Sequence, residues 1–350
     1  MRCCSTTKKD IKDLTLDEFS TYLKSVGEKS FRAQQIFKWI YDKKVDSFDA
    51  MRNVSSDLKE KLSQDFTFSI FSPYKKQISK DQTAKFLFEV GANQYVESVL
   101  IPAKGRLTLC ISTQVGCKFG CLFCASGKNG WLRNLSCSEI LNQILSAQKH
   151  DLSKKITHIV FMGIGEPFDN YDNVLKAIRI INDPKGFGIA ARRITVSTCG
   201  LIPEIKKFSQ EGLQIELAIS LHASDNKIRN RLMPVNKKYP LEKLLKTCQE
   251  YVQKTKRQIT FEYVLIKELN ASHRDAENLA SLLKGMLCKV NLIAYNQIDI
   301  PGCSAMGRDD IFRFKKILED RKILVTTRLA RGQDISAACG QLRYVNTEKN

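Results

Sequence analysis

A helical pattern of hydrophobic positions opens the chain. Apolar residues recur every three or four positions from Leu16 to Leu23, behind a Thr15–Glu18 pair of capping-box type. Two further short runs with the same spacing follow, around Phe31 to Ile40 and Leu58 to Leu62. We therefore expect residues 1–66 to form a small helical accessory domain.

The pattern then changes to one typical of strands. Residues 85–90 and 94–101 are strand-like runs, and Gly91-Ala92-Asn93 separates them. Glycine and asparagine tolerate the backbone conformation of a tight turn, so this pairing predicts a β-hairpin. We assign residues 67–103 to this hairpin region.

From Leu107 onward, apolar β-branched runs alternate with amphipathic runs of helical period. The strand candidates are 107–111, 158–162, 194–197, 215–221, 259–266, 290–295 and 323–327. The helix candidates are 139–149, 172–181, 203–210, 241–252, 276–283 and 310–318. This alternation predicts an α/β fold with a parallel sheet. About six β/α units fall short of a closed eight-unit barrel. We expect an open, partial (β/α)6 barrel over residues 104–330, followed by a C-terminal segment, 331–350.

Composition narrows the class of protein. The formal net charge is +19, which favours a polyanionic partner such as RNA or DNA, although a solvated basic surface is the alternative. Twelve cysteines are scattered along 350 residues. That is unlike a disulfide scaffold and typical of a reducing, cytoplasmic environment. We predict no signal peptide and no membrane span.

The densest chemical feature is a cysteine triad. Cys117, Cys121 and Cys124 have the spacing C-x3-C-x2-C, directly after the first barrel strand. Iron–sulfur clusters usually have four cysteine ligands, so three leave one iron free to bind something else. Closed structural zinc sites use four ligands. The spacing favours an open iron–sulfur cluster, with zinc or plain buried cysteines as alternatives.

Polar residues also end several predicted strands. Gly163-Ile164-Gly165-Glu166-Pro167, Ser197, the run Ser220-Leu221-His222 and Asn296 all stand at carboxyl ends. These ends meet at one rim of a β/α fold, where ligands bind. Each residue alone is more typical of a cap or turn, but together they indicate a binding site.

With Asp334 to Leu342, these motifs resemble the radical S-adenosylmethionine (SAM) superfamily and, within it, the RlmN/Cfr family of RNA adenine methyltransferases. The resemblance covers nearly the whole chain, including the helical module. It implies that Cys117, Cys121 and Cys124 hold a 4Fe-4S cluster, with SAM on the open iron. It further implies that SAM contacts Gly165, Glu166, Ser197, Ser220, Leu221, His222 and Asn296.

The resemblance also implies roles for residues outside the triad. Cys339 would carry a methyl group from a first SAM, a second SAM would activate that group, and Cys110 would release the product by forming a disulfide with Cys339. Glu97 would accept a proton. From the residues alone, the two cysteines would be buried hydrophobes and Glu97 a solvent-facing strand residue.

Two branches of the family differ in the carbon methylated. The run Gly130 to Leu135 and the Arg331-Gly332 pair are more similar to the RlmN type, which targets carbon 2 of adenine in 23S rRNA and tRNA. The alternatives are Cfr-type methylation of carbon 8 and a non-catalytic zinc- and RNA-binding protein. The resemblance implies an electron donor such as flavodoxin or ferredoxin, and we expect a monomer.

Several side chains are candidates for RNA contact. Trp131 and Phe119 could stack on bases, with core packing or a solvated face as the alternative, which we expect for Phe119. Basic residues that could neutralise RNA phosphates are Arg192, Arg193, Arg229, Arg231, Lys237, Lys238, Lys254, Lys256, Arg257, Arg328 and Arg331.

Overall fold

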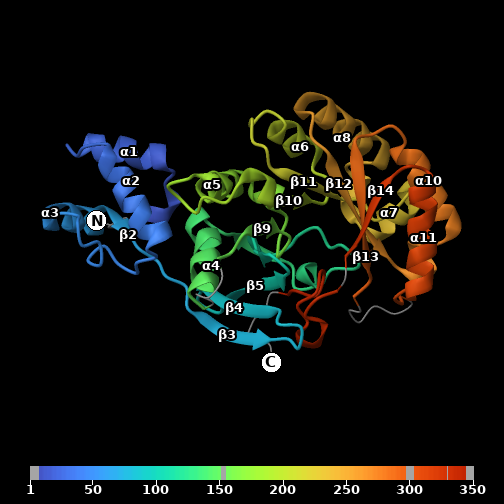
Figure 1. The fold of residues 1–350 in the computed structure, drawn as a ribbon, viewed down its shortest axis with the longest axis horizontal. Helices are drawn as coiled ribbons and strands as arrows, with labels where there is room; N and C mark the ends of the chain where they lie inside the picture. The colour runs from blue at the N-terminus through green and yellow to red at the C-terminus, as the bar shows by residue number, and fades with distance from the viewer. Residues whose placement is uncertain (1–7, 151–154, 297–302, 329, 344–350) are drawn as a thin grey trace, which may run out of the picture.

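The computed structural model describes residues 8–150, 155–296, 303–328 and 330–343, and its N-terminal part is helical (Figure 1). Helices α1 (Leu16–Ser25), α2 (Phe31–Phe37) and α3 (Ser56–Asp65) lie beside the barrel, and a π-helical turn, Lys38–Asp42, extends α2. Short strands β1 (Lys9–Asp10) and β2 (Phe66–Thr67) pair in parallel. The predicted capping box is present, with the Glu18 amide donating to Thr15 and the Thr15 amide to Glu18.

Ten strands form one sheet within the described ranges. Its first part is antiparallel: β3 (Pro73–Ile78), β4 (Ala84–Gly91), β5 (Gln94–Ala103) and β6 (Arg106–Cys110). The predicted hairpin is β4–β5, with Asn93 in the left-handed region at φ 57°. From β6 the sheet continues in parallel through β9 (His158–Phe161), β10 (Ile194–Thr198), β11 (Glu216–Ser220), β12 (Ile259–Leu265), β13 (Cys288–Ala294) and β14 (Leu324–Arg328).

Helices cover the outer face of the parallel part. They are α4 (Cys137–His150), α5 (Tyr171–Asn182), α6 (Ile202–Phe208), α8 (Leu241–Thr255), α10 (His273–Leu283) and α11 (Arg308–Asp320). The order of strands and helices confirms the α/β partial barrel. Its two end strands in the parallel part, β6 and β14, do not pair with each other in the described structure, so the barrel stays open.

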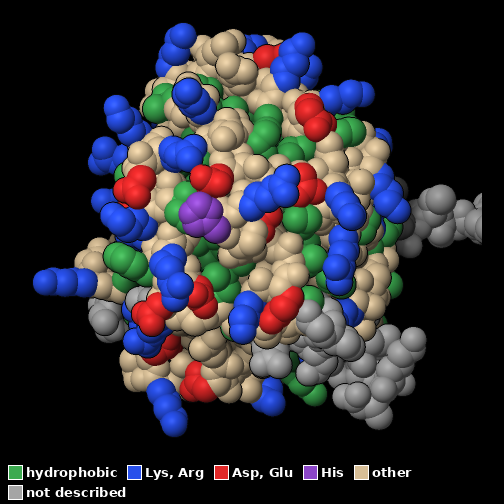
Figure 2. Space-filling model, turned by 90° about the vertical axis from the view of Figure 1, so that its right-hand side faces the viewer, with side chains coloured by type: hydrophobic (Ala, Val, Ile, Leu, Met, Phe, Trp, Pro, Cys, Tyr) green, Lys and Arg blue, Asp and Glu red, His purple; other side chains and the backbone are tan. Residues whose placement is uncertain are grey.

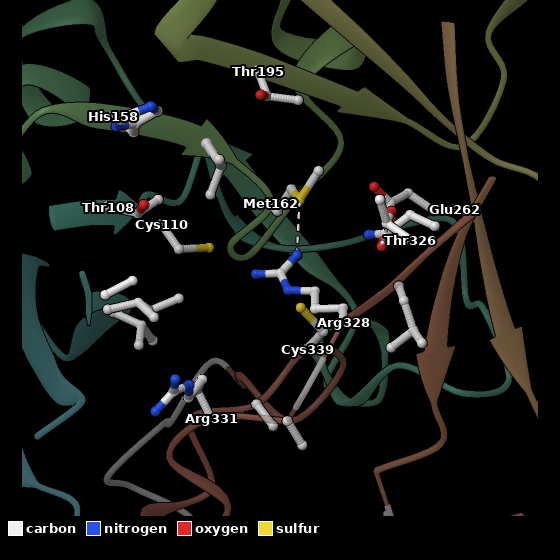
Figure 3. A pocket seen from close by; sticks show the side chains of 18 of the residues that line it. Thr108, Cys110, His158, Met162, Thr195, Glu262, Thr326, Arg328, Arg331 and Cys339 are labelled. Carbon is white, nitrogen blue, oxygen red and sulfur yellow. Dashed lines mark hydrogen bonds between the residues drawn. The ribbon is translucent and has the colours of Figure 1, made fainter. Parts of the chain in front are cut away.

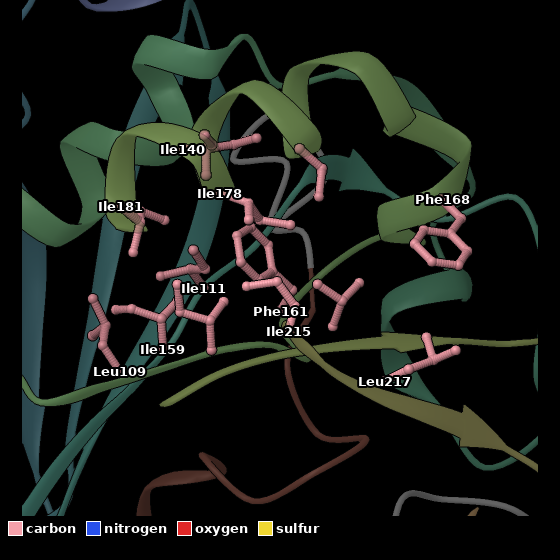
Figure 4. Packing of buried hydrophobic residues seen from close by; sticks show 14 of the residues in the cluster. Leu109, Ile111, Ile140, Ile159, Phe161, Phe168, Ile178, Ile181, Ile215 and Leu217 are labelled. Carbon is pink, nitrogen blue, oxygen red and sulfur yellow. The ribbon is translucent and has the colours of Figure 1, made fainter. Parts of the chain in front are cut away.

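Alternation along each strand separates a face that packs against the helices from a face that lines the barrel interior. Leu109 on β6 and Ile159 and Phe161 on β9 pack against Ile140 of α4 and Ile178 of α5 (Figure 4). The intervening side chains point the other way, into the barrel, because successive side chains of a strand face opposite sides. The barrel core is therefore built on one face and a cavity on the other.

Several short elements were absent from the expected set. Strands β7 (Gln114–Gly116) and β8 (Trp131–Asn134) form a separate antiparallel pair. Helices α7 (Asn226–Leu232) and α9 (Lys267–Asn270) lie in segments expected to be loops. Each has too few residues to show a clear hydrophobic period, which explains why the pattern does not reveal it.

Charge is mixed on the end of the molecule that carries α10 and α11. Lysine and arginine side chains there are spread among aspartate and glutamate rather than gathered in one patch (Figure 2). None of the helices described in the structure is long and apolar enough to span a membrane.

Replacing Phe161 with alanine tests the packing of β9 against α4 and α5. Phe161 is fully buried, so we expect Phe161→Ala to lower the free energy of unfolding by about 3–5 kcal/mol. Urea denaturation followed by circular dichroism measures the change. Phe312→Ala is the matched control, because this α11 side chain is 63% exposed and its loss should cost about 0.5 kcal/mol or less. Equal losses in both variants would contradict the packing described.

Candidate active site

The cysteine loop, residues 117–124, is anchored on both sides. It follows β7, where the Cys117 amide donates to the Gly130 carbonyl at 2.9 Å, just before β8. The Leu122 amide donates to the Leu232 carbonyl at 2.9 Å, which attaches the loop to the end of α7. The loop therefore lies beside the carboxyl end of the barrel, as the sequence predicts.

The three thiols of this loop influence one another electrostatically. Burial raises the pKa of Cys117 to about 12, and neighbouring Cys124 adds to the increase. Burial also raises the pKa of Cys121 and Cys124 above the ordinary thiol value. Metals bind the thiolate form, so a positively charged metal group is what would stabilise the ionised sulfurs here.

The donor set consists of three thiols on one loop. No three His, Cys, Asp or Glu side chains in the described ranges are grouped to hold one metal ion. A cluster of four irons is larger than one zinc and holds its ligand sulfurs further apart. Three thiols that influence one another electrostatically fit such a cluster, whose fourth iron needs no protein ligand.

Gly165 and Glu166 lie at the predicted rim. Gly165 has φ 100°, and a Cβ there would come within 2.6 Å of the Gln114 Cβ, so only glycine fits. The buried Glu166 carboxylate accepts hydrogen bonds from the Phe168 amide at 3.0 Å and the Cys199 amide at 2.7 Å. Burial nevertheless raises its pKa. A buried acid with two neutral donors suits a cationic ligand group.

Arg229 has a different role from the one its charge predicts. It was expected among the RNA-contacting residues, but it is fully buried. Its guanidinium donates to the carbonyls of Leu221, Cys199 and Ser220 at 3.1, 2.9 and 3.1 Å, and to Asn236. Arg229 therefore ties together the ends of β10 and β11, and the expectation that it contacts RNA is wrong.

His222 is held as a neutral ring. Its Nδ1 accepts from the Val264 amide at 3.0 Å, and the ring packs edge-on against Phe123 of the cysteine loop, with centroids 4.5 Å apart. Burial, reinforced by the positive charge of Arg229, lowers the pKa of His222 to about 3. The imidazole proton therefore stands on Nε2. Ser197 and Ser220 remain partly exposed at the same rim.

The C-terminal segment docks directly on the cysteine loop. The Ala125 amide donates to the Gly340 carbonyl at 2.7 Å, and the Ser126 hydroxyl donates to the Leu342 carbonyl at 2.7 Å. Gly340 has φ 83°, and a Cβ there would approach the Phe123 carbonyl oxygen to 2.7 Å. The Asn296 side chain donates to the Cys339 carbonyl at 3.1 Å. These contacts fix Cys339 beside the proposed metal ligands.

Cys339 and Cys110 line the same cavity, whose volume is about 530 Å³. Figure 3 shows their sulfur atoms on either side of the Arg328 guanidinium, which donates to the Met162 sulfur at 3.5 Å. The Cys339 sulfur, followed by Glu262 and Cys110, raises the pKa of Arg328, so the guanidinium stays charged. Arg328 therefore lies inside the barrel, and it was expected to contact RNA phosphates.

Of the expected SAM contacts, only Asn296 lines this cavity. Glu166 and His222 lie by the cysteine loop instead, since Glu166 acts electrostatically on Cys117 and Cys121 and His222 packs against Phe123. Gly165, Ser197, Ser220 and Leu221 lie at or just after the carboxyl ends of β9, β10 and β11. Every cysteine in the described ranges is free, Cys110 and Cys339 included.

Sequence reasoning missed Glu262, which lines the cavity and accepts from Asn291 at 2.7 Å. Its signal was present, because an acidic residue interrupts the otherwise apolar run of β12.

Glu97 is buried rather than solvent-facing, so the expectation from its strand position alone is wrong. Its carboxylate pairs with Lys85 at 2.9 Å and accepts from the Arg343 amide at 2.9 Å. Glu97 therefore joins the β4–β5 hairpin to the C-terminal segment, but it does not line the cavity of the two thiols.

The other candidates for RNA contact divide into two groups. The exposed basic candidates are Arg192, Arg193, Arg231, Lys237, Lys238, Lys254, Lys256 and Arg331. Arg257 pairs with Glu216, and Phe119 packs against the hydrophobic core. Trp131 is 41% exposed, with the Lys118 ammonium 5.6 Å from its ring centroid, so it remains available for stacking.

Two parts of the chain match known protein families. Residues 9–67 match the ribosomal RNA large subunit methyltransferase N-terminal domain, and residues 111–280 match the radical SAM superfamily. A probable dual-specificity RNA methyltransferase RlmN of Thermoanaerobacter sp. (strain X514) is 46% identical over 95% of this chain and 97% of that protein. Its namesake from Staphylococcus aureus (strain JH9) is 45% identical over 96% and 93%.

A solved structure is also similar. The crystal structure of a radical SAM methyltransferase from Sphaerobacter thermophilus superimposes with a TM-score of 0.90 at 41% identity, covering 95% of this chain and 99% of that one.

Replacing Gly340 with alanine tests the docking of the C-terminal segment. The added Cβ would clash with the Phe123 carbonyl and strain the positive φ, so we expect the segment to detach more often. A loss of about 1–2 kcal/mol in docking would speed tryptic cleavage after Arg331 or Arg343 by about 5- to 30-fold. Gly212→Ala is the control, because Gly212 has φ 67° but nothing within 4 Å of its Cβ position. The docking account fails if both variants are cleaved at the wild-type rate.

Proposed function

The chain belongs to the RlmN family of radical SAM RNA methyltransferases, and from this membership we propose that it methylates carbon 2 of adenine in RNA. The proposed targets are an adenine in the peptidyl-transferase centre of 23S rRNA and one next to the anticodon of tRNA. The relatives named dual-specificity RlmN enzymes support this choice over methylation of carbon 8. Membership in a family of enzymes also argues against the alternative hypothesis of a non-catalytic zinc- and RNA-binding protein.

Membership in the radical SAM superfamily implies a 4Fe-4S cluster and SAM. In this proposal the cluster is held by Cys117, Cys121 and Cys124, and SAM is contacted by Gly165, Glu166, Ser197, Ser220, Leu221, His222 and Asn296. When bound, the two cofactors supply the methyl group and the one-electron chemistry that activates it. Glu166 would receive the cationic end of SAM, since its buried carboxylate lacks a cationic partner among the described residues.

The observation that carries the proposal is the convergence of Cys110 and Cys339 on one cavity. They are more than two hundred residues apart in the sequence, and the docking of Gly340 brings the second one beside the cysteine loop. Neither thiol is a cluster ligand in the C-x3-C-x2-C motif. One of these two free thiols could carry the methyl group, and the other could release the product by forming a disulfide with it.

Adenine itself explains why a carrier is needed. Carbon 2 lies between two ring nitrogens and is electron-poor, so it does not attack a methylsulfonium as a nucleophile. We propose that Cys339 holds the transferred carbon on its sulfur until that carbon is bonded to the ring. Glu97, which pairs with Lys85 and does not line the cavity, would then take the proton from carbon 2, and one electron would leave the ring for the bound cluster. The Cys110 thiolate then bonds to the Cys339 sulfur, and the bond between that sulfur and the transferred carbon breaks. The electron pair of the broken bond goes to the carbon, which takes up a proton to become the methyl group, and the disulfide left behind must be reopened by an external reductant.

The remaining parts of the proposal concern partners. Each turnover would use two SAM molecules, one as the methyl donor and one as the source of the radical. Flavodoxin or ferredoxin would supply electrons. We further propose that the enzyme acts as a cytoplasmic monomer, with residues 1–66 as an RNA-binding accessory domain.

Replacing Cys339 with alanine tests the carrier role. We expect Cys339→Ala to abolish methylation of an RNA hairpin that carries an unpaired adenine in its loop, while SAM is still cleaved slowly. Anaerobic assays with mass spectrometry of the RNA and of the cleaved SAM measure both. Cys248→Ala is the control, because Cys248 is a buried thiol on α8, outside the cavity, and methylation should persist. RNA methylation retained by Cys339→Ala would remove Cys339 from the mechanism.

A further inference from the structure

The cavity of Cys110 and Cys339 has a second end, away from the cysteine loop. Arg106 begins β6, His158 begins β9 and Arg193 directly precedes β10, and all three line the cavity. These strands are neighbours and parallel, so their amino ends lie together at one edge of the barrel. We call Arg106, His158 and Arg193 the basic mouth.

The positive charge of the basic mouth is not neutralised by the protein. Among the described residues, no carboxylate forms an ion pair with Arg106 or Arg193, and both side chains are exposed. Burial, followed by the charges of these two arginines, lowers the pKa of His158, which places all three groups within electrostatic reach. By contrast, Arg257, which precedes the amino end of β12, is paired with Glu216 at the start of β11, the next strand after β10 in the sheet. Like charges held together without a counter-charge are typical of a site that receives an anion.

The basic mouth opens into the same cavity that Cys110 and Cys339 line. Cys110 is four positions beyond Arg106 on β6, and a strand rises about 3.3 Å per residue, so the thiol lies roughly 13 Å inside. Thr108 and Cys110 alternate into the lumen from β6, as His158, Val160 and Met162 do from β9 (Figure 3). A nucleotide turned out of its strand can extend into such a space, whereas a base stacked in a helix cannot.

We propose that Arg106 and Arg193 bind RNA phosphates that flank the target adenine, so that the base is inserted into the barrel from the amino ends of its strands. This inference rests on the proposed function, because it takes RNA as the substrate and Cys339 as the carrier. Arginine suits the role because its planar guanidinium can donate two hydrogen bonds to one phosphate. Such contacts set the position of the RNA and carry no sequence information themselves.

The geometry also assigns separate paths to the two substrates. Glu166 and His222, two of the expected SAM contacts, lie by the cysteine loop at the carboxyl ends of the strands, and the basic mouth lies at the amino ends. Cys339 lies between the two ends and lines the cavity that opens at the mouth. RNA and SAM would thus approach the carrier thiol from opposite sides.

Salt-dependent binding tests the basic mouth. The probe is the RNA hairpin with one unpaired loop adenine, bound to the cluster-loaded protein without SAM over a range of potassium chloride concentrations. Each phosphate contact contributes about 0.7–1 to the slope of log K against log salt. We expect Arg106→Gln and Arg193→Gln each to reduce that slope by this amount, and the double variant to reduce it by about twice as much.

Two controls sharpen the result. Arg106→Lys keeps the charge and should retain the wild-type slope. Arg274→Gln removes an exposed arginine on α10, far in sequence from the mouth, and should leave the slope unchanged. Slopes in the glutamine variants equal to that of the wild type would overturn the inference.

Methylation of the same hairpin is measured separately in the wild type. If the glutamine variants show the reduced salt slope but the wild type methylates no adenine, the RNA-binding role of the basic mouth is supported and the proposed function is wrong. If the wild type methylates the adenine and the variants bind RNA with an unchanged slope, only the basic mouth is wrong.

Discussion

The hydrogen bond from the Ala125 amide to the Gly340 carbonyl is the contact on which the proposed active site depends. It joins the cysteine loop to a segment more than two hundred residues later in the chain. There is no room for a side chain at position 340, because the Phe123 carbonyl oxygen occupies that space. Position 339 therefore has a fixed place next to the proposed cluster ligands, and its thiol faces the barrel cavity.

A second constraint is the two-residue period of the parallel strands. It directs Leu109, Ile159 and Phe161 toward the covering helices and leaves Cys110, Glu262 and Arg328 for the interior. The barrel can thus bury a large apolar core and still keep charged groups in its lumen. The buried Arg229 completes the rim by satisfying carbonyls from two strand ends that would otherwise lack donors.

Much of this arrangement could be predicted from the sequence, because it is encoded locally. The strand–helix alternation, the Thr15–Glu18 capping box and the cysteine spacing are all patterns within short segments. Arg229 and Glu97 could not be placed in this way. Arg229 is buried because carbonyls from two distant strand ends converge on it, and Glu97 because residue 343 returns to its strand. Neither convergence leaves a local pattern, so charge alone suggested a surface position.

Mass spectrometry of adenosines from 23S rRNA and tRNA, in cells with and without this gene, tests the central claim most directly. The account predicts that 2-methyladenosine is present in both RNAs and disappears when the gene is removed. Loss of 8-methyladenosine instead, or no change in any methylated adenosine, would contradict it.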